Sequence, residues 1–264
     1  MLDASRIRAG LPIGGLGLPL HVLQTVGSTN DHAARLARRG APHGTLVVAD
    51  EQTEGRGRRG RRWLTPAGSG LALSLVLRPG EVSQISPGAW NTVGALAVAE
   101  ALRGLGGEAS VKWPNDVLIG GQKVSGVLAE AVWKGEALEY LILGIGVNVL
   151  PGSVPPRSEL EFPATSVEAE IGRPVDRHEL LARIVGELAA WASKTASDDW
   201  RRAVEERLAY RGRWVHVIDE SGDVRGRILG IASDGRLVLD TGEGEPRRVG
   251  AGAAAVRLID SAPQ

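Results

Sequence analysis

The chain has 264 residues, 43% of them hydrophobic, so it can bury one large core, or a medium core and a small one. Its 31 basic residues balance 31 acidic ones, so no global field draws it to nucleic acid or to a membrane. The absence of cysteine excludes disulfides, thiolate metal sites and cysteine nucleophiles.

The first third of the chain predicts strands and a helix in alternation. An apolar run at Val22–Val26 predicts a strand, and residue types typical of helix caps at 27–31 lead into a helix over Ala33–Arg39. A second buried strand is predicted at Leu46–Ala49. The alternating pattern of Leu71–Leu77 predicts one amphipathic strand.

The middle of the chain predicts a helix followed by three strands. Ser86-Pro87 is typical of a helix start, and Gly106-Gly107 is typical of its end. Strands are predicted at Val111–Trp113, Val124–Trp133 and Leu138–Val149, with turns between them. These elements indicate an α+β fold with a mixed, largely antiparallel sheet backed by helices.

Two helices and a cluster of short strands are predicted after the proline-rich segment 151–163. The helices are expected at Asp176–Lys194 and Ser197–Tyr210. Short strands are then expected around Val215, Ile228, Leu237 and Val256, with turns at Ser221-Gly222, Asp234-Gly235 and 242–244. The pattern predicts a domain over 1–210 and a small β-barrel domain over 211–264.

The segment Met1–Leu20 lacks the charged start, apolar run and cleavage site of an export signal. No stretch reaches the roughly 18 consecutive apolar residues that a membrane-spanning helix needs. The sequence therefore predicts a cytoplasmic protein.

A loop at Gly55–Trp63 holds five arginines and three glycines ahead of a tryptophan. Glycines let backbone N–H groups approach an anion, guanidiniums neutralise it, and an indole offers a flat face to a heterocycle. A solvated turn or a nucleic-acid patch are the alternatives, and the neighbouring Glu51 and Glu54 disfavour the second. The loop is expected to enclose a planar anionic ligand.

Three other segments carry polar residues that a plain core would not contain. Ser28-Thr29-Asn30 is explained equally well by a helix cap. In Lys112–Asp116 a turn explains Pro114 and Asp116 but not the lysine and tryptophan before them. Lys123–Gly126 combines a lysine with a strand glycine that suits close approach to a ligand.

Taken together and in this order, these segments resemble the biotin protein ligase family. The resemblance rests on Ser-Thr-Asn at 28–30, Gln52 with Gly-Arg-Gly-Arg-Arg-Gly, Lys-Trp-Pro-Asn-Asp at 112–116, Lys-x-x-Gly-Val-Leu at 123–128 and Gly-Ile-Gly-Val-Asn at 144–148. It covers nearly the whole chain and implies a C-terminal barrel of the Src-homology type. Some members of the family begin with a winged-helix repressor domain; only about 20 residues precede the first predicted strand here, fewer than the roughly 50 a domain needs, so DNA regulation is not expected.

The resemblance implies an enzyme that forms biotinyl-5′-adenylate from biotin and ATP, with magnesium, and passes biotin to a lysine of a carboxyl carrier domain. It leaves a homodimer open. It implies Lys123 and Arg58 as catalytic residues. The implied biotin-binding residues are Ser28, Thr29, Asn30, Gln52, Arg56, Gly57, Arg58, Lys123 and Gly126, and the implied nucleotide-binding residues are Arg58, Arg61, Trp63, Asn115, Lys123 and Asn148.

Three further expectations concern the site. Metal ligands are not assigned, although Asp116 suits an orienting role toward a cation. The arginine loop is expected to be disordered without ligand and to fold over the adenylate, because glycines and like charges do not hold a loop together. The alternatives are a lipoate or octanoate protein ligase and, from another class, a nucleic-acid-binding module that uses the arginine-rich loop.

Overall fold

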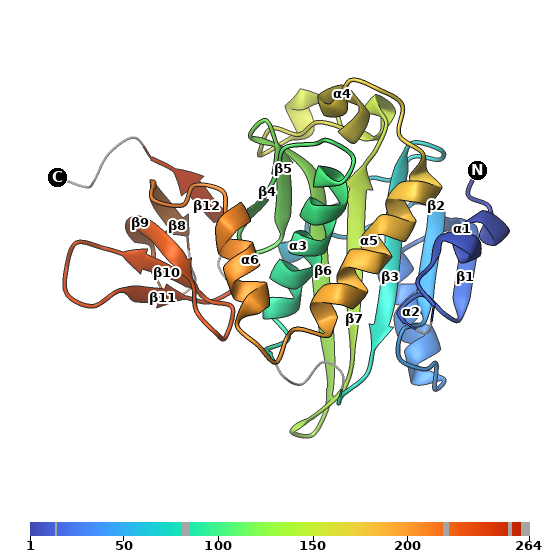
Figure 1. The fold of residues 1–264 in the computed structure, drawn as a ribbon, viewed down its shortest axis with the longest axis horizontal. Helices are drawn as coiled ribbons and strands as arrows, with labels where there is room; N and C mark the ends of the chain where they lie inside the picture. The colour runs from blue at the N-terminus through green and yellow to red at the C-terminus, as the bar shows by residue number, and fades with distance from the viewer. Residues whose placement is uncertain (14, 81–84, 219–221, 253–254, 260–264) are drawn as a thin grey trace.

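The computed structural model describes residues 1–13, 15–80, 85–218, 222–252 and 255–259. Its main sheet has the strand order β1-β2-β3-β7-β6-β5-β4 (Figure 1). The strands are β1 (Leu20–Val26), β2 (Leu46–Gln52), β3 (Gly70–Leu77), β4 (Ala109–Lys112), β5 (Asp116–Ile119), β6 (Gln122–Lys134) and β7 (Ala137–Asn148). Only β1 and β2 among these pair in parallel, which confirms the predicted mixed, largely antiparallel sheet.

Helices cover both faces of this sheet. The helices are α1 (Ala4–Gly10), α2 (Thr29–Arg38), α3 (Ala89–Arg103), α4 (Val167–Ile171), α5 (Arg177–Ala192) and α6 (Asp199–Arg207). Short 3₁₀ turns lie at η1 (Arg58–Gly60), η2 (Pro151–Ser153) and η3 (Arg157–Glu159). The main hydrophobic core lies between the sheet and α3 and α5, and a smaller core lies under α2 on the opposite face.

The position of β3 in the middle of the sheet corrects the prediction of an amphipathic strand. All of Gly70–Leu77 is buried. The leucines of β3 join the main core, whereas Val76 joins the smaller core under α2. A strand covered by helices on both faces needs apolar or small residues at every position, so alternation does not mark a solvent face here.

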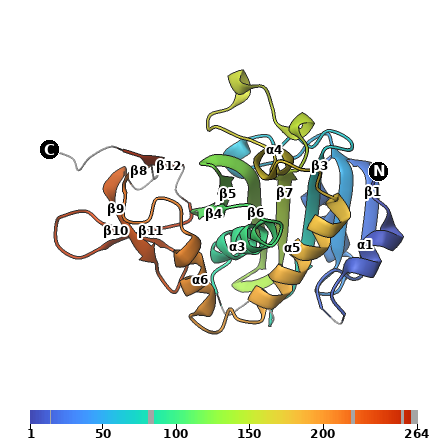
Figure 2. The ribbon, with the colours of Figure 1, turned by 45° about the horizontal axis from the view of Figure 1, so that its top comes forward.

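A second sheet follows α6 and is antiparallel throughout, with the order β11-β10-β9-β8-β12. Its strands are β8 (Trp214–Ile218), β9 (Val224–Ile231), β10 (Leu237–Asp240), β11 (Arg247–Val249) and β12 (Ala255–Leu258). Figures 1 and 2 show it beside α6, at the β4 side of the main sheet. The predicted small C-terminal β domain is confirmed, whereas Ser221 of one predicted turn and the last residues, 260–264, lie outside the described residues.

Candidate active site

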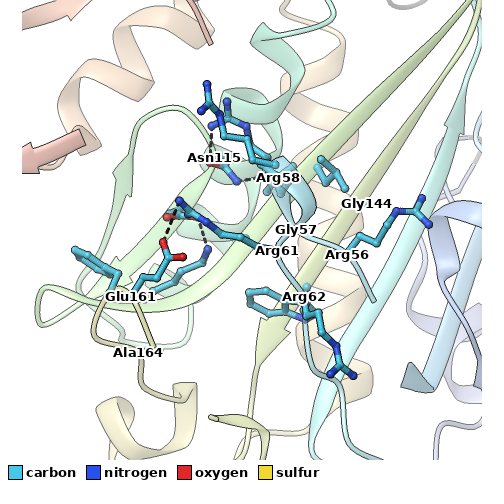
Figure 3. A pocket seen from close by; sticks show the side chains of 18 of the residues that line it. Arg56, Gly57, Arg58, Arg61, Arg62, Asn115, Gly144, Glu161 and Ala164 are labelled. Atoms are coloured by element: carbon cyan, nitrogen blue, oxygen red, sulfur yellow. Dashed lines mark hydrogen bonds and ion pairs between the residues drawn. The ribbon is translucent and has the colours of Figure 1, made fainter. Parts of the chain in front are cut away.

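A cavity of about 470 Å³ lies over β6 and β7, beneath the arginine loop Gly55–Trp63 (Figure 3). Every residue that the sequence assigned to the site lines this cavity. They are Ser28, Thr29, Asn30, Gln52, Arg56, Gly57, Arg58, Arg61, Trp63, Asn115, Lys123, Gly126 and Asn148. Segments as distant in sequence as α2 and β7 therefore meet at one place.

One end of the cavity carries a polar group that we call the amide–hydroxyl cluster: Thr29, Asn30, Gln52 and Ser74. The backbone N–H and the hydroxyl of Thr29 donate to Gln52 Oε1 at 2.8 and 3.0 Å. The Ser74 hydroxyl lies 2.8 Å from Thr29 Oγ1 and 2.6 Å from Asn30 Oδ1. A hydroxyl has one proton, so Ser74 serves one of these acceptors at a time. The other oxygen can accept from a ligand N–H.

Ser28 lies where a helix cap was considered, at the start of α2. The residue occupies the N-cap position of α2, but its side chain makes no capping hydrogen bond. It is 4% exposed and lines the cavity. The helix begins at Thr29 rather than at Ala33, so Thr29 and Asn30 belong to its first turn. The positive end of the helix dipole therefore points toward this part of the cavity.

The arginine loop is folded into a compact turn. Gly57 N–H donates to the Arg61 carbonyl at 2.7 Å, and Trp63 N–H donates to the Gly55 carbonyl at 2.8 Å. Gly60 has a φ of 72°, in the left-handed region that glycine adopts without a steric cost. Backbone bonds thus shape the closed loop, and its predicted disorder without ligand stays a prediction.

The side chains of the loop diverge. Arg56 forms two hydrogen bonds with the Asp31 carboxylate, at 2.6 and 2.7 Å, and points away from Arg58 and Arg61 (Figure 3). This hydrogen bond raises the pKa of Arg56 and is the main cause that lowers the pKa of Asp31. Arg61 reaches across the cavity mouth to Glu161, at 3.1 Å.

Arg58 and Arg59 join the loop to the second sheet. Arg58 donates to the Ala251 carbonyl and lies 3.4 Å from Asn115 Oδ1. Arg59 donates to the Gly252 carbonyl at 2.6 Å. Burial lowers the pKa of Arg58, which still leaves a guanidinium charged at neutral pH. A half-buried cation therefore lies in the wall between the cavity and the second sheet.

Two lysines share one carboxylate at the anionic end of the cavity. Lys123 Nζ lies 2.5 Å from Asp116 Oδ1, and Lys112 Nζ lies 3.8 Å from Asp116 Oδ2. Lys112 Nζ also lies 4.0 Å from the centroid of the Phe162 ring. Burial lowers the pKa of Lys112, Asp116 opposes the shift, and Lys123 adds to it. The sequence assigned Lys123 to the site but not Lys112.

Trp63 lies against glycine backbone. Gly126 and Gly146 are cross-strand partners on β6 and β7, and a Cβ atom added at Gly146 would overlap the Trp63 indole. Lys123 Nζ lies 5.5 Å from the centroid of the same ring. The sheet and Lys123 thus cover part of the indole. Because the strands carry glycine here, their backbone determines the position of the ring.

Asn115 and Asn148 each use an amide N–H within the protein. Asn115 Nδ2 donates to the Val127 carbonyl at 2.9 Å, and Asn148 Nδ2 donates to the Thr165 carbonyl at 3.2 Å. Both side chains nevertheless line the cavity. The amides thus have fixed orientations before any ligand is considered.

Two cavity-lining segments were missed by sequence reasoning. The first is 155–164, which includes Glu161 and Phe162. Backbone hydrogen bonds from Lys123 to Pro163 and from Thr165 to Lys123 hold the end of this segment to β6. The second is 255–257, which brings Arg257 to the cavity from β12. Neither segment carries a recognisable motif, because only tertiary folding brings them near Lys123. Ser74 gave one signal, a serine within a leucine-rich strand.

Two protein-family models match the chain, each over a different stretch. Residues 22–148 match the biotin/lipoate A/B protein ligase family, and residues 211–257 match the biotin protein ligase C-terminal domain. The two stretches include the arginine loop and the second sheet, respectively. Both halves of the fold therefore match parts of one kind of enzyme.

Curated relatives and solved structures agree with this match. The chain is 34% identical over 256 residues to biotin--[acetyl-CoA-carboxylase] ligase of Mycobacterium tuberculosis, covering 91% of each chain. It is 35% identical over 233 residues to the enzyme of the same name from Paracoccus denitrificans, covering 83% of this chain and 92% of the relative. It resembles biotin protein ligase from Aquifex aeolicus in complex with biotin and ATP, with a TM-score of 0.77, 33% identity and coverage of 91% and 99%. The chain belongs to the biotin protein ligase family.

Proposed function

We propose that this protein activates biotin with ATP to biotinyl-5′-adenylate and transfers the biotinyl group to a lysine of a biotin carboxyl carrier domain. One observation carries the proposal: Thr29, Asn30 and Gln52 of the amide–hydroxyl cluster and the cations Lys112, Lys123 and Arg58 line the same cavity of about 470 Å³. A neutral polar ring and a pair of anions can therefore lie end to end within it. The relatives named above support the choice of biotin.

The amide–hydroxyl cluster would bind the ureido ring of biotin. A ureido group has two N–H donors and one carbonyl acceptor, and the cluster offers hydroxyls and amides of both kinds. Ser28, Thr29, Asn30 and Gln52 would contact the ring directly, with Gly126 leaving room beside the strand. A ligand without a matching N–H would leave the oxygen that Ser74 does not serve without a donor, at a cost of ~1–3 kcal/mol.

The cationic end would bring the biotin carboxylate and the α-phosphate of ATP together. A carboxylate oxygen attacks the α-phosphorus, and pyrophosphate leaves; an acceptor amine then attacks the acyl carbon, and AMP leaves. Lys123 and Arg58 would stabilise the charge that develops in the first step, with help from Arg61 and the Gly57 backbone. Asp116 holds Lys123 at 2.5 Å and so keeps its ammonium in one place.

The nucleotide would lie toward Trp63, Asn115 and Asn148. The strand glycines cover part of the Trp63 indole, and a base can stack on the part that lines the cavity. The Oδ1 atoms of Asn115 and Asn148 can accept hydrogen bonds, since their Nδ2 atoms are committed to carbonyls. Arg56 is held by Asp31, so its contribution to biotin binding would come through the loop backbone.

Magnesium would enter with ATP. Among the described residues, no three His, Cys, Asp or Glu side chains lie close enough together to hold a metal ion by themselves. Mg²⁺ commonly binds to substrate phosphates and one or two carboxylates, and the cavity wall offers Asp116, Glu159 and Glu161. The donors present fit such shared coordination, in which Mg²⁺ offsets phosphate charge.

Several smaller predictions belong with this proposal. A catalytic domain over 1–210 and a β domain over 211–264 are supported by the separate family matches at 22–148 and 211–257. A cytoplasmic location and a homodimer remain predictions from the sequence, to be tested by fractionation and by sedimentation. Within the part of the chain that the structure covers, every helix is too short or too polar to cross a membrane.

The test is incubation with biotin, labelled ATP, Mg²⁺ and a biotin carboxyl carrier domain. We expect labelled adenylate first and then biotin on one carrier lysine. Parallel reactions with lipoate and octanoate test the enzyme alternative, and turnover of those acids in preference to biotin would overturn the proposal. Salt-sensitive retention on DNA or RNA without ATP turnover would favour the nucleic-acid-binding module instead.

A further inference from the structure

Glu130, on β6, contacts both the cavity wall and the arginine loop. Its Oε2 accepts a hydrogen bond from Asn30 Nδ2 at 2.6 Å. Its two oxygens lie 3.3 and 3.5 Å from an Arg56 guanidinium nitrogen. Glu130 is not among the residues that line the cavity. One carboxylate outside the cavity therefore connects a cavity residue with the loop that covers it.

The contact with Asn30 fixes the orientation of its amide. Asn30 Nδ2 donates to Glu130, and Asn30 Oδ1 lies 2.6 Å from the Ser74 hydroxyl. Rotating the amide by 180° would place its oxygen against the carboxylate, and neither of these two oxygens can donate a hydrogen bond. Glu130 thus determines which Asn30 atom can meet a ligand.

Asp31 extends the connection from α2. Arg56 binds Asp31 in bidentate fashion and meets Glu130 with the same nitrogen, so one guanidinium lies between two carboxylates. If the loop opens, Arg56 leaves and no longer lies between the two carboxylates, although Arg35 and Arg38 still act on Asp31. Like charges at short range repel, so opening is opposed from the protein side.

These ion pairs are too exposed to hold the loop by themselves. The side chains of Arg56, Asp31 and Glu130 are 40, 44 and 39% exposed, and exposed pairs of this kind contribute little to stability. A small free-energy difference is nevertheless enough to couple ligand binding to loop closure, because the coupling energy adds to the binding energy of the ligand. The network suits transmission rather than anchoring.

We propose that Glu130 is a positioning residue that couples occupancy of the amide–hydroxyl cluster to closure of the arginine loop. This inference rests on the proposed function, since it takes biotin as the occupant. A ligand that orders Asn30 strengthens its bond to Glu130, and the oriented carboxylate then favours the closed position of Arg56. By reciprocity, a closed loop raises the affinity of the cluster for its ligand.

Two substitutions at Glu130 separate its two contacts. Glu130→Gln keeps an oxygen for Asn30 and removes the charge that meets Arg56. Glu130→Ala removes both. Asp31→Asn weakens the anchor of Arg56 without touching Asn30, and Glu139→Gln, an exposed carboxylate on the adjoining strand, is the matched control. Circular dichroism checks that each variant folds.

The measurements are biotin affinity by calorimetry and the rate of proteolysis within Gly55–Trp63, with and without saturating biotin. Biotin should slow cleavage in the wild type and in Glu139→Gln. Protection should fall about five- to tenfold in Glu130→Gln and Glu130→Ala at equal occupancy. By reciprocity, biotin affinity should fall by a comparable factor in Glu130→Gln and further in Glu130→Ala, which also loses the bond to Asn30, and Asp31→Asn should loosen the loop with a smaller loss of affinity.

The outcomes also separate this inference from the proposed function. If the wild type neither binds biotin nor forms adenylate, the function fails. If the wild type does both and biotin protects the loop of Glu130→Ala as well as that of the wild type, the coupling role is overturned. Equal losses of affinity and protection in Glu130→Gln and Glu130→Ala would also contradict it, because they would indicate a general structural role.

Discussion

Asp116 sets the positions of both lysines at the anionic end of the cavity. It lies 2.5 Å from Lys123 and 3.8 Å from Lys112, and its side chain is 15% exposed. A carboxylate between two ammonium groups offsets their repulsion and fixes the nearer one. An incoming carboxylate and phosphate then meet cations that are already ordered, which is what stabilisation of a transition state requires.

Lys123→Ala should reduce adenylate formation by about 10²–10³-fold while leaving the fold intact. The variant removes the ammonium closest to Asp116 and leaves that carboxylate facing the cavity without its main partner. Pyrophosphate release measures the step, and circular dichroism measures the fold. Lys134→Ala, an exposed lysine at the end of the same strand, is the control. A normal rate in Lys123→Ala would remove this residue from the mechanism.

Lys112 should give the folding free energy a measurable pH dependence. Burial lowers its pKa below the ordinary 10.5, so the folded state loses this proton at a lower pH than the unfolded state does. Between the lowered pKa and 10.5 the unfolded state binds more protons, and the free energy of unfolding should rise with pH. Lys112→Met should lack that rise. Urea titrations of both proteins from pH 7 to pH 10.5 test this, and parallel curves would contradict it.

At the residue scale, the sequence could identify side chains that belong to contiguous motifs. Gln52, Lys123 and Asn148 line the cavity as predicted. Ser74 and Glu130 were not found, because their importance comes from hydrogen bonds to Asn30, which lies far away in sequence. A pattern along the chain does not contain such partners.

The arginine loop and the glycine-containing strands beneath it form one unit. Trp63 closes the loop through its N–H bond to Gly55 and rests its ring over Gly146. Strand glycines usually weaken a sheet, since they add no side-chain packing. Here the missing side chains give room to an indole and to Asn30, whose amide a Cβ atom at Gly144 would overlap.

Gly146→Ala should displace Trp63 and impair the site more than the fold. The added methyl group overlaps the indole, and overpacking of this kind costs about 1–3 kcal/mol where backbone and ring must both move. Adenylate formation should fall, and tryptophan fluorescence should shift. Gly186→Ala is the control, because a Cβ atom there meets nothing within 4 Å. Unchanged fluorescence in Gly146→Ala would show that the indole does not lie on this strand.

At the element scale, the sequence predicted types better than boundaries. The helix expected from Ser86-Pro87 begins at Ala89, and β5 and β11 were not predicted at all. These strands have only four and three residues, which is too few for a periodic pattern. The four-residue β10 was predicted because turn residues at 234–235 and 242–244 flank it. Long elements such as β7 and α5 carry enough residues for their pattern to be recognised.

The second sheet is held to the rest of the molecule by hydrogen bonds from two places, the segment after β4 and the helix α6. Trp113 Nε1 donates to the Gly235 carbonyl at 3.0 Å, and Glu205 of α6 accepts from Ile231 N–H at 3.0 Å. Trp113 is 3% exposed. The Lys-Trp-Pro-Asn-Asp segment therefore serves both the cavity, through Lys112 and Asp116, and the second sheet.

Trp113→Phe should loosen the second sheet by leaving the Gly235 carbonyl without its buried donor. The loss of the indole N–H should lower the free energy of unfolding by about 1–3 kcal/mol. Amide hydrogen exchange in β9 and β10 should become faster. Trp133→Phe, at a position 53% exposed, should change neither quantity. Identical exchange in Trp113→Phe and in the wild type would exclude this connection.

At the scale of the whole molecule, the sequence predicted the two-part organisation but not how the parts meet. The change to short strands after Tyr210 was visible as a change in pattern. The approach of Arg257 to the cavity was not, because it depends on how β12 is placed against the main sheet. Such placement arises from many contacts, each too weak to appear as a motif.

Arg58 and Arg59 meet the second sheet at the main-chain oxygens of Ala251 and Gly252. A carbonyl group is present whatever amino acid is encoded, so these contacts tolerate exchange of one small residue for another. They are sensitive to the number of residues between Val249, the end of β11, and Gly252, since one insertion or deletion there would shift both oxygens. Substitutions at Ala251 and Gly252 should therefore preserve both hydrogen bonds, whereas a change in the number of residues before them should break the contact with Arg58 and Arg59.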